Sequence, residues 1–141
     1  MGTENYVKKL GLTPGDEIVV PKSNWNLIQH HAIYIGFDYH GRHWIIDNNV
    51  TEGVRLIQVD TFFSQATKIN AINRFQGTNT ERKALVKKAL ASLGHPYSLI
   101  DFNCQHFTSE LLTGRRQSYQ VQNIAAVAII VVLIGLLTSK G

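Results

Sequence analysis

Cys104 is the only cysteine of the chain and the residue best suited to nucleophilic chemistry. It follows Asn103, a residue type that often caps a helix, so we expect Cys104 in the first turn of a helix. Backbone N–H groups and the helix dipole lower the pKa of a thiol at such a position, and the same N–H groups can stabilise an oxyanion. A buried structural cysteine is the alternative, since a lone cysteine usually packs as a small apolar residue.

A thiol nucleophile needs a base, and the chain has six histidines. His106 lies about 200° around a helix from Cys104 and should point away from it. His30 and His31 lie inside an expected strand over residues 29–37, where neighbouring side chains point to opposite faces of a sheet. The face of His31 carries two isoleucines and predicts packing, whereas that of His30 carries a small alanine that leaves room for a substrate. We therefore predict His30 as the base.

A third polar residue should orient the imidazole. Asp47 ends an expected strand over residues 43–47, which pairs with the strand of His30 across a short hairpin. A contact between Asp47 and His30 across this pair is geometrically natural, and we predict Asp47 as the orienting residue. The hairpin does not define the register to a single residue, so Asn48 and Asn49 stay open, as does an ordinary strand-end role for Asp47.

A metal centre made by the histidines and Cys104 is a competing interpretation. The chain lacks Cys-x-x-Cys or His-x-x-x-His spacing, and a single cysteine excludes zinc sites that need two thiolates. The glycines are too widely spaced for a phosphate-binding loop. We therefore expect no metal and no cofactor. A net charge of +4 is too small and too scattered to predict a nucleic-acid partner.

The order of the expected elements, strands first and helices after them, predicts an α+β domain with a mostly antiparallel sheet. Alternating apolar residues between turn signals predict strands at residues 17–20, 29–37, 43–47, 53–59 and 68–75. A capping box at Thr78 begins one helix, which Gly94 ends, and its apolar stripe includes Leu90 and Leu93. A second helix should cover residues 103–114.

The C-terminal part of the chain differs from the rest in composition. No charged residue occurs from Gln117 to Ser139, and residues 124–137 are apolar throughout. A helix of the apolar run alone is only about 21 Å long, but the whole uncharged stretch can cross the ~30 Å hydrocarbon core. Flanking basic residues suit both interfaces, so we predict a single-pass or tail anchor over residues 115–141, after a domain of residues 1–114. The alternative is a buried core helix.

The overall composition is that of a small globular protein. Of the 141 residues, 44% are hydrophobic and 17% are charged, which suits one domain with its own core. A single cysteine excludes an intrachain disulfide, and the polar N-terminus shows no secretory signal. We therefore expect a monomer whose domain faces the reducing cytosol.

Two segments resemble the motifs of a known family. Residues 29–36 (QHHAIYIG) resemble the H-box, and residues 97–99 (YSL) with residues 103–107 (NCQHF) resemble the NC motif. With residues 14–16 (PGD) and the apolar tail, nearly the whole chain resembles the H-box/NC family, typified by lecithin:retinol acyltransferase and the HRAS-like suppressor phospholipase A/acyltransferases. The resemblance implies a circularly permuted papain-like (NlpC-type) fold, in which the histidine precedes the cysteine, and a C-terminal hydrophobic helix.

The same resemblance implies roles for individual residues. Cys104 matches the family's nucleophile and His30 its general base. Asp47 stands where the family usually has a histidine, and Lys22 is nearest to the basic residue ahead of the H-box. The implied enzyme is a phospholipase A1/A2 and acyltransferase, which moves a fatty acyl group from a membrane glycerophospholipid, through a cysteine thioester, to water or to an amine or lysolipid acceptor. Two alternatives stay open: a non-catalytic membrane or interaction protein with this fold, as among viral members, and a papain-like peptidase.

Overall fold

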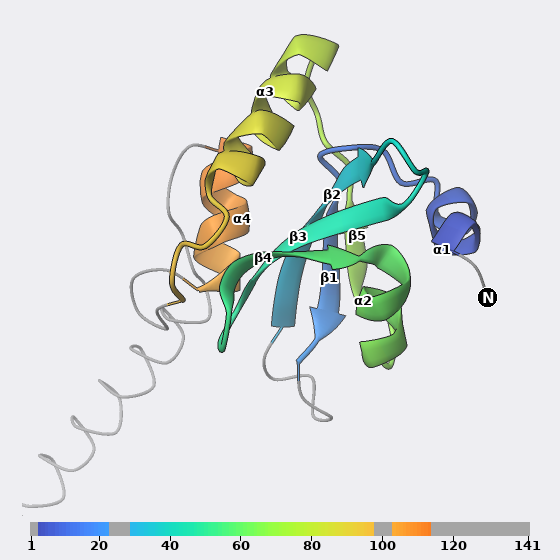
Figure 1. The fold of residues 1–141 in the computed structure, drawn as a ribbon, viewed down its shortest axis with the longest axis horizontal. Helices are drawn as coiled ribbons and strands as arrows, with labels where there is room; N and C mark the ends of the chain where they lie inside the picture. Colours follow the sequence, from blue (N-terminus) through green and yellow to red (C-terminus); the bar gives the residue numbers. More distant parts are fainter. Residues whose placement is uncertain (1–2, 23–28, 98–102, 114–141) are drawn as a thin grey trace, which may run out of the picture.

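The computed structural model describes residues 3–22, 29–97 and 103–113, and it confirms the predicted α+β class. Its centre is a five-stranded antiparallel sheet in the order β4-β3-β2-β1-β5 (Figure 1). The strands are β1 (Glu17–Pro21), β2 (Gln29–Phe37), β3 (His43–Asn49), β4 (Gly53–Gln58) and β5 (Ala71–Asn73). The helices are α1 (Thr3–Leu10), α2 (Val59–Gln65), α3 (Asn79–Ala91) and α4 (Cys104–Thr113).

Different helices cover the two faces of the sheet (Figure 1). The side chains of one face, including Ala32 and Tyr34 of β2, pack with α1 and with two phenylalanines of α2. The side chains of the other face, including Ile33 of β2, pack with α3 and α4. Because alternate residues of β2 belong to different faces, His30 and His31 lie on opposite sides of the sheet, as predicted.

The pairing of β2 with β3 decides which residue lies across from His30. Ala32, the next residue of β2 on the face of His30, pairs with Asp47. Further along, the register shifts next to Gly36, which has a φ of 111° that glycine adopts without strain. Asp47 therefore shares the sheet face of His30, while Asn48 is fully buried and points to the opposite face.

The predicted capping box is present at the start of α3. Thr78 Oγ1 accepts a hydrogen bond from the N–H of Glu81 (3.2 Å), and Glu81 Oε2 accepts one from the N–H of Thr78 (2.6 Å). The helix ends at Ala91, before the predicted end at Gly94. Gly94, with a φ of 84°, instead donates its N–H to the carbonyl of Val54 (2.9 Å), and this bond ties the segment after α3 to β4.

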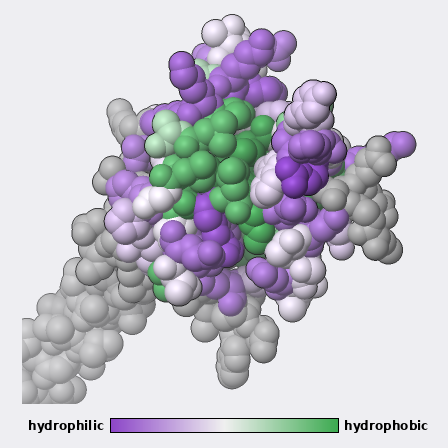
Figure 2. All heavy atoms as spheres, in the orientation of Figure 1, coloured by the Kyte–Doolittle hydropathy of each residue, from purple (hydrophilic) through white to green (hydrophobic). Residues whose placement is uncertain are grey.

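The apolar stripe of α3 is less buried than predicted. Leu85 and Ala89 lie in the core, but Leu90 and Leu93 are 40% and 41% exposed. Leu90 lines an open groove of about 530 Å³ together with Val86 and three basic side chains. Figure 2 shows a hydrophobic area beside α3 that is bordered by hydrophilic residues. The helix therefore packs only part of its apolar stripe against the sheet.

Three elements differ from the predictions. The sequence pattern predicts neither α1 nor α2, and Val59, expected at the end of a strand, begins α2. A helix here buries Val59, Phe62 and Phe63 together, because residues three and four apart share one helical face. β5 is shorter than expected, since the N–H of Phe75 donates to the carboxylate of Asp16 (3.0 Å) and not to a strand.

The predicted membrane anchor over residues 115–141 lies outside the described residues. Within the three described ranges, no helix combines the length and the apolar character that crossing a membrane requires. The last described residue is Thr113, at the end of α4. The boundary between a domain and an anchor thus stays a prediction from composition.

Candidate active site

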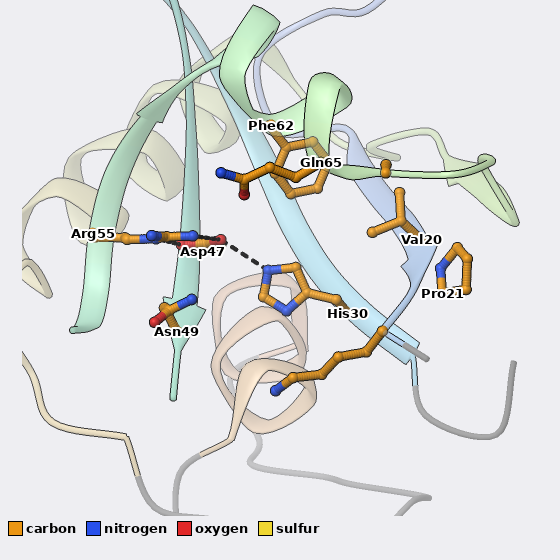
Figure 3. Close-up of a pocket in the computed structure, with 10 residues that line it drawn as sticks. Val20, Pro21, His30, Asp47, Asn49, Arg55, Phe62 and Gln65 are labelled. Carbon is orange, nitrogen blue, oxygen red and sulfur yellow. Dashed lines mark hydrogen bonds and ion pairs between the residues drawn. The ribbon is translucent and has the colours of Figure 1, made fainter. Parts of the chain in front are cut away.

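The sheet brings His30 and Asp47 together across β2 and β3. His30 Nε2 lies 2.8 Å from Asp47 Oδ2, so the predicted cross-strand contact is present (Figure 3). The Asp47 side chain has no exposed surface and that of His30 is 13% exposed. His30 is the second residue of β2 and lines a pocket, while Asp47 lies two residues before the end of β3.

The charge of Asp47 defines which ring nitrogen of His30 carries hydrogen. Burial raises the pKa of the Asp47 carboxyl, but hydrogen bonds from His30 and Arg55 outweigh burial, and the pKa lies below its usual range. A charged carboxylate only accepts hydrogen bonds, so Nε2 of His30 is the donor. In the neutral imidazole the other nitrogen, Nδ1, is then the one that can accept a proton.

Arg55 on β4 is a member of this cluster that the sequence reasoning missed. It pairs directly with Asp47 in the β3–β4 register. Its Nε donates to Asp47 Oδ1 (2.9 Å) and its Nη2 to Asp47 Oδ2 (3.3 Å), while Nη1 donates to Glu52. The signal was available in the sequence, because a tight turn after residue 49 places two opposite charges across from each other.

A pocket of about 180 Å³ opens beside His30 (Figure 3). One wall is the ring of Phe62, whose centre lies 6.0 Å from that of His30. Among the described residues that line the pocket, Lys22 and Arg55 are cations and Asp47 is the anion, so cations outnumber anions there. The Lys22 ammonium lies 5.3 Å from the centre of the Tyr97 ring. An anionic group on a ligand would be attracted here.

His31 belongs to a separate polar cluster on the opposite face of the sheet. Its Nδ1 lies 2.9 Å from Glu17 Oε1, and Asn73 Nδ2 donates to Glu17 Oε2 (2.7 Å). Burial raises the pKa of Glu17, but the hydrogen bonds from His31 and Asn73, with a further one from Thr108, bring it below its usual value. The buried position predicted for His31 is confirmed, and its cluster joins β1, β2 and β5 to α4.

α4 begins at Cys104, as predicted, and Asn103 before it is buried. The side chains of Cys104 and His106 lie outside the part of the chain that the structure describes, so the nucleophilic role predicted for Cys104 and the orientation predicted for His106 stay predictions. Phe107 and Leu111 of this helix pack against the sheet on the face of His31.

The direction of α4 is defined by contacts along its length. Thr108 is close enough to Glu17, the partner of His31, to help lower the pKa of that carboxyl, and Leu112 near the end of the helix lines a pocket with Phe75. Phe75 lies against Gly15, whose N–H donates to the carbonyl of Tyr34 further along β2 (2.8 Å). α4 therefore runs along β2 with its first turn toward the end of the strand that carries His30 (Figure 1).

His40 and His43 lie in and beside the hairpin loop between β2 and β3, away from His30. His43 Nδ1 lies 2.7 Å from the hydroxyl of Tyr34, and His40 lies in the exposed hairpin loop before β3. Among the described side chains, no group of three or more histidine, cysteine or acidic residues is placed to hold a metal ion.

Comparison with known proteins gives one finding. A family model described as lecithin retinol acyltransferase matches residues 11–117, which cover most of the chain. The match includes His30, Asp47, Arg55 and Cys104. No curated protein matches the chain.

Proposed function

Because the chain belongs to the lecithin retinol acyltransferase family, we propose that it is a thiol-dependent phospholipase A and acyltransferase. Membership of the family supports activity of the acyltransferase or phospholipase type in general. The observation that carries the finer proposal is the buried pair of His30 and Asp47, in which a charged carboxylate accepts a hydrogen bond from Nε2–H. This arrangement suits a histidine that exchanges protons through Nδ1.

In the proposed first half-reaction, His30 Nδ1 takes the proton of the Cys104 thiol, and the thiolate attacks an ester carbonyl of a glycerophospholipid. Backbone N–H groups in the first turn of α4 stabilise the tetrahedral oxyanion. The C–O bond of the ester then breaks. The leaving lysophospholipid takes the proton from His30, and the acyl group stays on Cys104 as a thioester.

In the second half-reaction, water or an amine attacks the thioester. His30 removes a proton from the attacking group as the new bond forms, and the proton then returns to the Cys104 sulfur as it leaves. Attack by water releases a fatty acid, which is the phospholipase outcome. Attack by an amine, such as that of phosphatidylethanolamine, gives an N-acylated product, and a lysolipid hydroxyl gives a new ester.

The order of the elements supports a circularly permuted papain-like fold for this chemistry. His30 on β2 and Asp47 on β3 both precede Cys104 at the start of α4. We further propose that residues 115–141 anchor the domain to a membrane from its cytosolic side, because the uncharged stretch and its basic ends suit a bilayer. The Lys22 ammonium in the pocket suits the phosphate of such a substrate.

The proposal predicts a covalent intermediate. Incubation of the full chain with phosphatidylcholine and rapid quenching in acid should yield a mass increase of one acyl group on Cys104, detected by mass spectrometry. Cys104→Ser should show no thioester. Peptide hydrolysis without an adduct would identify a papain-like peptidase, and lipid binding with neither reaction would identify a non-catalytic member.

A second measurement tests activation of the thiol. We expect alkylation of Cys104 by iodoacetamide to have a midpoint at least about one pH unit below the free-thiol value of about 8.5, because the helix start and His30 both favour thiolate. His30→Ala should move the midpoint toward that of a free thiol. A wild-type midpoint near 8.5 would contradict the proposed activation.

A further inference from the structure

Asp47, the carboxylate that orients His30, is also hydrogen-bonded to Arg55, which is not one of the three proposed catalytic-site residues Cys104, His30 and Asp47. The guanidinium of Arg55 contacts both oxygens of Asp47, at 2.9 Å and 3.3 Å, and Oδ2 also contacts His30 (Figure 3). The Asp47 side chain has no exposed surface, whereas that of Arg55 is 23% exposed. Asp47 thus lies buried between a permanent cation and a group that gains and loses charge.

We infer that Arg55 is a positioning residue, which keeps Asp47 charged and aimed at His30 in both protonation states of the imidazole. When His30 is a cation, Asp47 already has a partner of opposite charge. When His30 is neutral, Asp47 without Arg55 would be a buried carboxylate with no counter-charge, which is strongly unfavourable. A guanidinium stays protonated at every pH of interest, so it supplies that counter-charge throughout.

The sign of the effect on His30 follows from this arrangement. Arg55 shares the negative charge of Asp47, so it weakens the attraction between Asp47 and the imidazolium and makes the neutral base easier to form. Without Arg55, loss of the proton from His30 would leave Asp47 uncompensated. The pKa of His30 would therefore be higher without Arg55. The inference relies on the proposed function only for the role of His30 as a base.

Among the residues that the structure describes, few other charged groups face the pair. Glu52, in the turn before β4, accepts a hydrogen bond from Arg55, and its side chain is 60% exposed. From the end of β1, Lys22 lines the same pocket, and α2 contributes only uncharged side chains to its wall. On α4, the proposed function places the thiol of Cys104 beside His30, and the experiment below removes this thiol. A change in the titration of His30 can thus be assigned to the substituted residue.

The test is a titration of the His30 ring by ¹H–¹³C NMR in the full chain carrying Cys104→Ala, with the His30 signal assigned by its loss in His30→Gln. Arg55→Gln should raise the pKa of His30 by about one unit, a tenfold increase in proton affinity. Arg55→Lys keeps the charge but offers one contact point, and should raise it by a few tenths of a unit. Arg42→Gln removes an arginine paired with Asp38 in the exposed hairpin, and should leave His30 unchanged.

An unchanged His30 titration in folded Arg55→Gln would overturn the inference. If Arg55→Gln does not fold, the titration of Arg55→Lys provides the test. An unchanged His30 pKa in Arg55→Lys would also contradict the inference. The titration needs neither substrate nor thiol. A shifted His30 in a protein that forms no acyl adduct would overturn the proposed function alone, and an unshifted His30 in an active enzyme would overturn only the role of Arg55.

Discussion

Cys104→Ala and His30→Ala are each expected to lower fatty acid release from phosphatidylcholine by at least about a thousandfold, because nucleophile and base act as a unit and neither works alone. His31→Ala should keep a readily measured rate, since His31 bonds to Glu17 on the other face of the sheet. The measurement is product formation by mass spectrometry in mixed micelles, with circular dichroism to verify that each variant folds.

The adjacent histidines make His31 a matched control for His30. The loss of its buried hydrogen bond should cost His31→Ala about 1–3 kcal/mol of unfolding free energy without removing a reacting group. An inactive His31→Ala beside an active His30→Ala, both folded, would show that the base has been assigned to the wrong face of the sheet.

Deletion of the chain from Gln117 onward is expected to lower hydrolysis of phospholipid in vesicles by about a hundredfold, because an anchor raises the local concentration of enzyme at the bilayer. The truncated domain should still react with iodoacetamide at Cys104 and should still hydrolyse a dispersed short-chain phospholipid. These two readouts separate loss of the anchor from loss of the site.

Two outcomes would assign the apolar tail to the folded core instead. One is a truncated chain that does not fold, and the other is a full-length protein that stays in solution without detergent. Either result would favour the alternative of a buried C-terminal helix, in which apolar side chains are covered by protein and not by lipid.

Much of the sheet could be predicted from the sequence, because β2 and its neighbours alternate apolar residues between clear turn signals. α2 could not, since Val59, Phe62 and Phe63 fit the end of a strand as well as a helical turn. Only packing against the core of α1 and the sheet decides between them. The exposure of Leu90 depends likewise on where α3 crosses the sheet, which no local pattern encodes.

In the candidate site, the contact between His30 and Asp47 could be predicted because alternation assigns faces and a hairpin brings two strands together. The sequence pattern left Asn48 and Asn49 open, since a shift of one residue exchanges the faces of a strand. The observed register places Asp47 on the face of His30. Arg55 was missed because the predicted strand ends at residue 47, whereas β3 continues to Asn49, and only a tight turn directly after Asn49 pairs Arg55 with Asp47.

The register shift beside Gly36 has a consequence for how this family of sequences can change over time. It lies between the hairpin tip and the stretch of β2 that pairs with Asp47. Insertions or deletions in the loop of residues 38–42 can change the pairing next to this shift without moving His30 relative to Asp47. A single residue inserted between His30 and Tyr34 would exchange the two histidines between faces. Related chains should therefore vary freely in the length of this loop while keeping the spacing from His30 to Gly36 constant.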